Sequence, residues 1–444
     1  MHSHERFDAL VVGAGPAGSV AALVLARGGA RVALVDKARF PRDKACGDLV
    51  GPRGLQVLAD LGIEEPSSCR VGDMIVMGPT GRSVRLPSFP GWTYPDHAMA
   101  MPRARFDAIL RDAALVAGAE PVTGRVVDPI RSANGLQGFM LSDGRRLRAD
   151  VVIGADGALS RVATAASLVD PSRVLWGFAV SAYVEELVRL PHIVMWEPEP
   201  WRIFPGYGWL FPGVDGYANV GLGLGLRADR SGAVAATDWF DSFIDHLRRL
   251  GVLSRRPSRR PSLRGGWLKM GMIGTIPARR RTLLVGDAAG LVNPLQGEGI
   301  SQAMRSGRAA AEAVLAGPDA AATRYSAFLA ATYAPFESVT AAAQWAMLKR
   351  PRLVSVLGRV LTAPVLSHAL RGGWSIYWND LLEGAAPSSA RNIASLVALA
   401  GPAATSRGRT RRWFSEAMSL RSSSFVTRSA FPRTTQPGSR PSPE

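Results

Sequence analysis

The stretch FDALVVGAGPAGSVAALVLARGGARVALVD, residues 7–36, decides the fold of this chain. Its first six residues are mostly apolar and suit a buried strand, and the Ala- and Leu-rich segment 17–27 is typical of a helix. A second apolar segment, 31–35, follows and leads into Asp36. A strand, a helix and a strand of this total length predict a βαβ unit with parallel strands.

The turn between the first strand and the helix has the spacing G-x-G-x-x-G. Gly13 permits a tight turn, Gly15 lets the backbone approach a pyrophosphate, and Gly18 lets the helix pack on the strand. The helix N-terminus offers free N–H groups to the phosphates. Asp36 suits the free ribose hydroxyls of FAD or NAD better than the phosphorylated ribose of NADP. A glycine-rich turn without a ligand is the alternative.

A second motif, VGDAAG at residues 285–290, places Gly286 and Asp287 after another short strand. Asp287 can hydrogen-bond a ribityl hydroxyl at that strand end. The turn of Gly297 and Gly299 directs the N–H groups of the following helix at the edge of a flavin that becomes anionic on reduction. Taken alone, the segment also fits a plain turn with glycine caps.

A third motif, GADGALSR at residues 154–161, follows the strand DVVIGA. Asp156 and Gly157 form a turn there, which is often only a turn. We expect this turn to lie near the cofactor.

The three motifs, in this order, resemble the glutathione-reductase-type flavoproteins with a hydroxylase-like two-domain layout. Further segments resemble the geranylgeranyl reductase family within that group. They are FPRDKACGD (40–48) for P-x-x-K-x-C-G, MPRARFD (101–107) for R-x-x-F-D, YGWLFP (207–212) and GLG (221–223) for Y-x-W-x-F-P…G-x-G, and NPLQGEGI (293–300) for N-P-x-x-G-E-G-I. The W-x-W-x-I-P signature of flavin-dependent halogenases is replaced by GYGWLFP, residues 206–212.

The resemblance implies that the chain binds FAD, which NAD(P)H or another donor reduces. The sequence contains no second G-x-G-x-x-G domain for a nicotinamide, so that donor would dock transiently. By resemblance, FAD contacts are expected at Ala17, Asp36, Cys46, Gly47, Arg103, Val126, Asp287, Gly299 and Ile300. The motifs add Gly13, Gly15, Gly18, Asp156, Gly157, Gly286 and Gly297.

The family reduces isolated C=C bonds in prenyl chains, including geranylgeranyl diphosphate, chlorophyll side chains, archaeal lipids and menaquinone tails. Adding a hydride and a proton to such an alkene requires a long, dry, apolar site. We expect Tyr207 and Trp209 in a catalytic role and Trp209 and Phe211 against the substrate, with ordinary core packing as the alternative. We expect the Cys46 thiol beside the flavin, where it helps protonation; a small buried hydrophobe is the alternative.

The fold class expected from these features is α/β: a Rossmann-type FAD-binding domain, an inserted antiparallel β-sheet substrate domain and a C-terminal helical region. Aromatic and apolar residues that alternate with Gly and Pro in 176–225 predict the antiparallel sheet. The expected boundaries are 1–70, 98–172 and 275–330 for the first domain, 71–97 and 173–274 for the second, 331–404 for the helical region and 405–444 for a disordered basic tail.

The net charge of +17 over 444 residues, with a pI near 11.0, invites a nucleic-acid or anionic-membrane partner. However, residues 247–264 hold seven Arg and no acid, and residues 405–444 carry a net +6, which leaves +4 for the remainder. We expect the first segment to be an exposed loop that meets a lipid diphosphate or a membrane surface, with a solvated charge run as the alternative. A non-catalytic nucleic-acid-binding protein would explain the pI but not the three motifs, so we expect no specific nucleic acid.

The two cysteines, Cys46 and Cys69, exclude a disulfide-stapled secreted fold. The polar first residues lack the apolar segment of a signal peptide, so we expect a cytoplasmic protein with peripheral membrane contact. The histidines have no metal-ligand spacing, and no metal is expected. The segment around Trp374 and Trp378 is expected to cover the substrate tunnel or touch the membrane, with helical core as the alternative.

The first functional hypothesis is a flavin-dependent reductase of a prenylated small molecule or lipid. The alternative is a flavin-dependent monooxygenase, a hydroxylase or epoxidase, that acts on an aromatic or isoprenoid small molecule with O₂.

Overall fold

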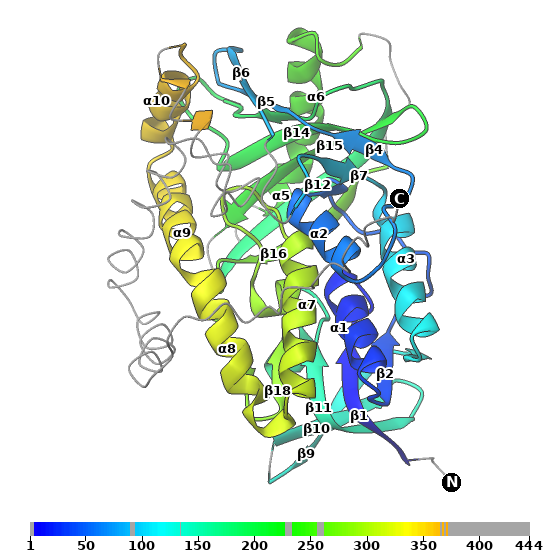
Figure 1. Ribbon diagram of the computed structural model, residues 1–444. Coiled ribbons are helices and arrows are strands. Elements are labelled where there is room, and N and C mark those ends of the chain that lie inside the picture. Colours follow the sequence, from blue (N-terminus) through cyan, green and yellow to red (C-terminus); the bar gives the residue numbers. More distant parts are fainter. Residues whose placement is uncertain are drawn as a thin grey trace, which may run out of the picture.

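The computed structural model describes residues 4–88, 94–133, 135–226, 233–254, 262–364, 366–367 and 370–371. In this part of the chain a mostly parallel sheet, a mostly antiparallel sheet and a small third sheet are combined with helices (Figure 1). The expected α/β class is confirmed. The domain boundaries stay a prediction, and the expectations for Trp374, Trp378 and the tail 405–444 lie outside the described residues.

The first sheet contains the βαβ unit predicted from residues 7–36. Its strands are β1 (His4–Val12), β2 (Val32–Asp36), β8 (Glu120–Thr123), β9 (Val126–Ser132), β10 (Gly135–Leu141), β11 (Arg146–Gly154), β17 (Ala278–Arg279) and β18 (Thr282–Leu284). β1 lies between β2 and β11, and β18 pairs with β11, all in parallel. In this register Val12 is opposite both Val35 and Gly154, and Gly154 is opposite Leu284. The loops that follow these strands therefore meet at one edge, where open α/β sheets bind their ligands.

Helices in contact with one another cover this sheet (Figure 1). They are α1 (Pro16–Arg27), α2 (Pro52–Asp60), α3 (Arg103–Val116), α7 (Ile300–Leu315) and α8 (Ala321–Thr332). Three short helical segments, α4 (Arg161–Ala165), η1 (Gly286–Ala289) and η2 (Pro318–Ala320), follow β11, β18 and α7 in the chain. A Cβ on Gly18 would lie 1.8 Å from the carbonyl oxygen of Gly13, and a Cβ on Gly307 would lie 2.2 Å from that of Ala17. Glycine at these positions lets α1 lie directly on the turn after β1 and lets α7 lie directly on α1.

The second sheet has the strand order β16-β12-β15-β14-β13-β5-β6. Its strands are β5 (Met74–Met77), β6 (Ser83–Leu86), β12 (Leu175–Glu185), β13 (His192–Val194), β14 (Gly206–Pro212), β15 (Tyr217–Leu226) and β16 (Arg264–Met270). All neighbours pair antiparallel except β5 and β13. Helices α5 (Ala233–Asp238) and α6 (Phe240–Arg249) accompany it, and a small sheet joins β3 (Leu49–Val50), β7 (Ala98–Ala100) and β4 (Cys69–Val71).

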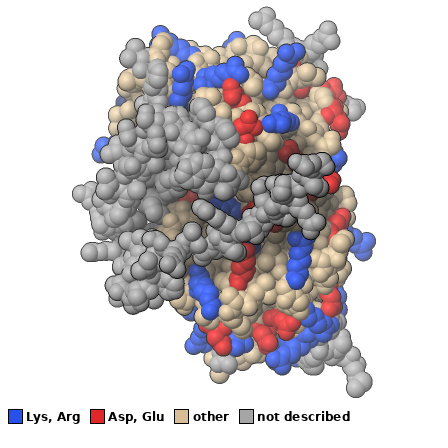
Figure 2. All heavy atoms as spheres, in the orientation of Figure 1, with Lys and Arg blue, Asp and Glu red and all other residues tan. Residues whose placement is uncertain are grey.

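The C-terminal helices in the described part of the chain are α9 (Ala334–Lys349) and α10 (Pro351–Leu361). Together with α8 they form a column along one side of the molecule (Figure 1). No helix among the described residues is both long and apolar enough to cross a membrane. On the face seen in Figure 2, basic and acidic side chains of the described residues are interspersed.

The contact between α1 and α7 gives a stability prediction for Gly307→Ala. Alanine favours a helix interior by about 1 kcal/mol over glycine, but the new Cβ would overlap the Ala17 carbonyl. Overpacking of this kind costs about 1–3 kcal/mol or more. We therefore expect a lower melting temperature in thermal unfolding. Gly72→Ala is the control, because its Cβ would meet only Ser88 Oγ, at 3.8 Å. A Gly307→Ala protein as stable as the control would contradict the close contact.

Candidate active site

The turn after β1 forms a cradle at the N-terminus of α1. Gly13 has a φ of +105°, and a Cβ there would lie 2.3 Å from the carbonyl oxygen of Ala155, so the position requires glycine. A Cβ on Gly15 would meet only the Arg42 guanidinium, at 3.5 Å. Gly15 is also the N-cap, so no side chain caps α1 there. The space beside Gly15 is open apart from Arg42, and an anion can bind there at the helix N-terminus.

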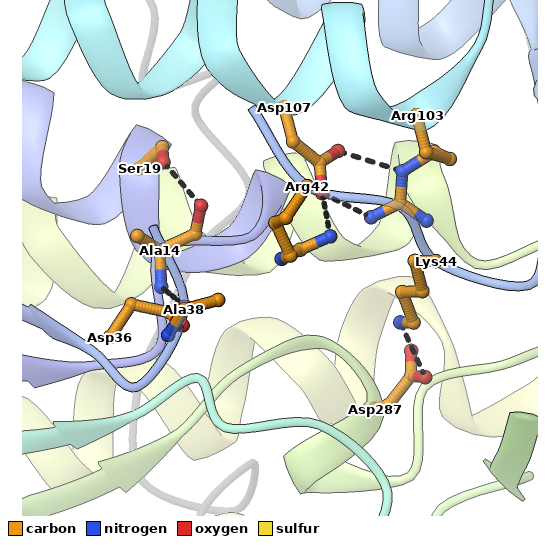
Figure 3. A network of polar contacts seen from close by, with 9 residues as sticks. All are labelled: Ala14, Ser19, Asp36, Ala38, Arg42, Lys44, Arg103, Asp107 and Asp287. Atoms are coloured by element: carbon orange, nitrogen blue, oxygen red, sulfur yellow. Dashed lines mark hydrogen bonds and ion pairs between the residues drawn. The ribbon is translucent and has the colours of Figure 1, made fainter. Parts of the chain in front are cut away.

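Asp36 fastens this turn to the end of β2. One carboxylate oxygen accepts a hydrogen bond from the Ala14 N–H and the other from the Ala38 N–H, both at 2.8 Å (Figure 3). Asp36 lines a cavity with Ala14 and with side chains of the next loop and strand. The other lining residues include Arg39, Phe40, Arg111, Val122 and Thr123. The structure therefore places Asp36 where an adenosine group attached to the phosphates would lie.

A second cavity has many more lining residues and is called the larger cavity below for that reason; it lies between the second sheet and the loops and helix ends at the carboxyl edge of the first sheet. Its polar lining comes mainly from the loop after β2, from α3 and from the segment around η1: Lys44, Cys46, Arg103, Asp287 and Glu298. Its apolar lining comes mainly from the second sheet: Met74, Ile193, Trp209, Phe211, Leu224, Leu268 and Met270. This cavity reaches Pro16, whereas the Asp36 cavity reaches Ala14. The Gly15 cradle thus stands between the two cavities, an arrangement that fits an extended dinucleotide with its pyrophosphate at Gly15.

Asp287 lies on η1 at the wall of the larger cavity. Lys44 Nζ reaches across to its carboxylate at 3.6 Å (Figure 3). Gly297, with a φ of +64°, and Gly299 turn the chain into α7, and both line the cavity together with Ile300. The structure therefore brings the second sequence motif and Lys44 to one place. Lys44 belongs to the P-x-x-K-x-C-G segment, although no role was predicted for it.

Arg103 and Cys46 meet at the first turn of α3. The buried Arg103 guanidinium donates to both carboxylate oxygens of Asp107, each at 2.7 Å, and Arg42 adds a contact to Asp107 at 2.9 Å (Figure 3). Arg103 and Cys46 both line the cavity. Burial raises the pKa of the Cys46 thiol, and the positive charge of Arg103 opposes that rise. The thiol stays protonated near neutral pH, with a cation beside it.

The aromatic residues of β14 form one wall of the same cavity. Trp209 stacks on Phe211 with ring centroids 6.2 Å apart at 28°, and Tyr207 lies on the other side of Trp209 at 6.1 Å. A Cβ on Gly221 would lie 2.2 Å from the Trp209 ring, so glycine in β15 makes room for the indole. The Tyr207 hydroxyl donates to the Gln296 carbonyl, beside the turn that precedes α7. The structure brings all three aromatic residues to the cavity.

Helix α9 completes the lining with Gln344 and Met347. A Cβ on Gly225 would lie 1.7 Å from Gln344 Nε2. Helix α9 therefore packs on β15 at a position where that strand has no side chain. The sequence predicted a helical region here but singled out neither residue.

A polar network behind the Cys46–Gly47 turn was missed by the sequence analysis. Asp48 is 3% exposed, and one carboxylate oxygen accepts from the Tyr183 hydroxyl and, at 2.9 Å, from Asn219 Nδ2. Asn219 Nδ2 also donates to the Cys46 carbonyl at 2.8 Å, and its Oδ1 accepts from Trp209 Nε1 at 2.9 Å. Burial raises the pKa of Asp48 to about 6. The position of Asp48 directly after Cys46–Gly47 was the available signal.

Lys269 is a second residue that the sequence did not reveal. It is 1% exposed on β16, and its Nζ donates to the Ala288 carbonyl of η1 at 2.5 Å. Burial lowers the pKa of Lys269 to about 8, and the charges of Asp156 and Asp287 limit this shift. The ammonium group thus links the second sheet to the Asp287 turn.

Several residues assigned to cofactor binding line neither cavity. Asp156 accepts hydrogen bonds from the backbone N–H groups of Arg161 at 2.7 Å and Val162 at 3.2 Å and thereby holds the start of α4. Val126 is buried in the hydrophobic core between the first sheet and its helices. Gly157 has a φ of +79° in the turn after β11. A direct role of these residues at the cofactor stays a prediction.

Three others, Ala17, Gly18 and Gly286, support the site by packing. A Cβ on Gly286 would lie 3.2 Å from the methyl groups of Ala17 and Ala303. These small residues let α1, η1 and α7 converge beneath the cradle.

A family model described as FAD binding domain matches residues 6–177. The chain is 35% identical over 320 residues to the menaquinone reductase of Mycolicibacterium smegmatis, an alignment that covers 70% of this chain and 77% of the relative. It is 33% identical over 325 residues to the geranylgeranyl diphosphate reductase of Rhodobacter capsulatus, with 70% and 75% covered.

Solved structures share the fold. A geranylgeranyl bacteriochlorophyll reductase-like protein from Thermoplasma acidophilum has a TM-score of 0.60 at 22% identity, with 94% of this chain and all of that chain covered. A flavin-dependent brominase has a TM-score of 0.65 at 19% identity, with 88% and 99% covered.

The place of Asp287 in the cavity gives a prediction for FAD binding. Asp287→Ala removes the carboxylate that we expect to accept a hydrogen bond from the cofactor, and it leaves Lys44 without this partner. A hydrogen bond to a charged group is worth about 1.5–3 kcal/mol, so FAD should bind about 10- to 100-fold more weakly. The measurement is the FAD content after gel filtration and the dissociation constant from flavin fluorescence. Asp319→Ala removes an exposed carboxylate paired with Arg281 and is the control. Equal FAD affinity in both variants would refute the role of Asp287.

Proposed function

The chain belongs to the geranylgeranyl reductase family of FAD-dependent oxidoreductases, and from this premise we propose that it reduces C=C bonds in the prenyl chain of a lipid substrate. A prenylated quinone such as menaquinone is the first substrate to test, because a menaquinone reductase is 35% identical to this chain. NAD(P)H or another reductant supplies the electrons.

The division of the larger cavity carries the proposal. Its apolar and aromatic wall comes from the second sheet, with Trp209 and Phe211 at its centre, and its polar wall holds Cys46, Arg103 and Asp287. An extended hydrocarbon gains about 25 cal/mol per Å² of apolar surface removed from water. Such a chain lies against the second sheet and directs a double bond at the polar wall.

When bound in its reduced form, FAD supplies the hydride for one alkene carbon. The residues of the chain must then exclude water and deliver a proton to the other carbon. Trp209 and Phe211 cover the apolar side, and the Tyr207 hydroxyl holds the turn at Gln296. We assign the proton to Cys46 Sγ, which is protonated near neutral pH. As the S–H bond breaks, the electron pair stays on sulfur, where the Arg103 guanidinium stabilises the negative charge.

Product mass tests this function against the monooxygenase alternative. Anaerobic incubation of the protein with FAD, NAD(P)H or dithionite and a prenyl panel, led by menaquinone, should give products heavier by about 2 Da per reduced bond, since one H₂ is added. An aerobic product heavier by about 16 Da would support a monooxygenase instead. Unchanged prenyl substrates under both reductants would overturn the proposal.

We also propose that the protein reaches its lipid substrate by peripheral contact with a membrane. Helix α10 is held by Glu197, which lies between β13 and β14 of the second sheet and accepts a hydrogen bond from Arg359 Nε at 3.1 Å. Its opposite face exposes Leu353 (49%), Leu357 (46%) and Val360 (39%). An amphipathic helix with such a face lies in a lipid interface, and neighbouring basic residues favour anionic lipids.

A vesicle assay tests this contact. We expect the protein to float with vesicles that contain anionic lipid, and the double variant Leu353→Ser/Leu357→Ser to float several-fold less, because burial of a leucine is worth about 1.5–3 kcal/mol. Val116→Ser is the control, since Val116 is 90% exposed at the end of α3. Equal flotation of the double variant and the control would reject α10 as the contact.

A further inference from the structure

The strongest feature that the proposed function does not use is the buried carboxyl group of Asp48. Its side chain lines neither cavity, although Cys46, Gly47 and Leu49 around it all line the larger one. One carboxylate oxygen receives both hydrogen bonds, from Tyr183 and Asn219, while Oδ1 is buried and has no hydrogen-bond partner. A buried ionised carboxylate with an unpaired oxygen is costly. Burial therefore favours the neutral form of the Asp48 carboxyl group more than a position on the protein surface would.

The backbone at this residue is also constrained. Asp48 has a φ of +62°, a left-handed conformation that is uncommon for a residue with a side chain. The carbonyl of Asp48 accepts from the Met101 N–H at 2.9 Å, just before α3 begins. The surrounding hydrogen bonds thus hold a strained residue in place, which is a pattern that clusters at functional sites.

Asn219 connects Asp48 to Cys46, which is two residues away in the chain. Its Nδ2 donates to the Asp48 carboxylate at 2.9 Å and to the Cys46 carbonyl at 2.8 Å. A negative charge on Asp48 disfavours a thiolate on Cys46, because like charges in a buried site repel. The protonation state of Asp48 therefore acts directly on the acidity of the thiol.

The groups that face Asp48 come from several elements. Tyr183 lies on β12 and Asn219 on β15, while Arg103 approaches from α3. Tyr183 lies partly exposed beneath Arg264, whose guanidinium carbon is 5.6 Å from the ring centroid, and Arg264 pairs with Asp43 at 3.0 Å. Asp48 itself is 3% exposed, so these groups and not solvent surround its carboxyl group.

We propose that Asp48, held by Tyr183 and Asn219, is a positioning residue that sets the acidity of the Cys46 thiol. In its neutral form it leaves Cys46 the stronger proton donor, and in its ionised form it makes Cys46 the weaker one. This inference rests on the proposed function only in assigning the proton of Cys46 to the reaction. The effect on the thiol itself is independent of the substrate.

The test measures the thiol and not the reaction. In a Cys69→Ser background, the rate of Cys46 alkylation by iodoacetamide is followed by mass spectrometry on the FAD-bound protein from pH 5 to 9. The pKa of Asp48 is raised to about 6, so the wild-type carboxyl group is ionised above that pH. Asp48→Asn removes this charge, and we expect Cys46 to be alkylated about tenfold faster at pH 8.

Tyr183→Phe provides a second signature, in the same direction but confined to a range of pH. Loss of the hydroxyl removes a hydrogen bond that stabilises ionised Asp48, so the carboxyl group ionises at higher pH. Alkylation should exceed the wild-type rate near pH 7 and converge with it at higher pH. Asp319→Asn, at an exposed carboxylate that pairs with Arg281 outside this network, should match the wild type throughout. A purely structural role predicts instead a change of equal size at every pH in both variants, and that result would overturn the proposal, as would an unchanged Asp48→Asn profile.

Activity then provides a separate measurement. With a prenyl substrate that the protein reduces, the wild-type rate should fall as the pH rises through about 6, and Asp48→Asn should lack this fall. If no prenyl substrate is reduced, the proposed function fails, while the alkylation profiles still decide the role of Asp48.

Discussion

The direct contact of α1 with the turn after β1 is the constraint on which the rest of the structure depends. Gly18 lies against the carbonyl of Gly13, and Gly307 brings α7 against α1 in the same way. Without side chains at these contacts, the helix N-terminus reaches the carboxyl edge of the parallel strands. The Asp36 cavity, the cradle at Gly15 and the Asp287 turn all follow from this placement, because each lies at that edge.

The second sheet likewise depends on a glycine that leaves space for a larger side chain. Gly221 provides the space in which the Trp209 indole lies, and Trp209 then holds Asn219. Asn219 in turn fastens the backbone of Cys46. The aromatic wall of the cavity and the Cys46 loop are therefore joined by hydrogen bonds close to the proposed proton donor.

Local motifs predicted much of this arrangement. The βαβ unit, the glycine turn, the Asp287 turn and the aromatic strand depend on residues near one another in sequence, so their spacing reveals their roles. The contacts of Asp48, Tyr183 and Lys269 could not be found in this way, because the partner of each lies in another element or loop of the fold. The motif around Asp156 illustrates the opposite difficulty: its aspartate holds the start of a short helix, a use that the same letters also permit.

The packing of α9 on β15 affects which part of the cavity can change shape. Gln344 and Met347 reach the cavity from α9. This helix packs on β15 of the second sheet at Gly225, which leaves room for it. Substitutions on α9 can reshape the space for the substrate while the dinucleotide cradle stays intact. The part of the cavity wall that α9 supplies is thus a separate module from the dinucleotide cradle, and its shape can change while the cradle is preserved.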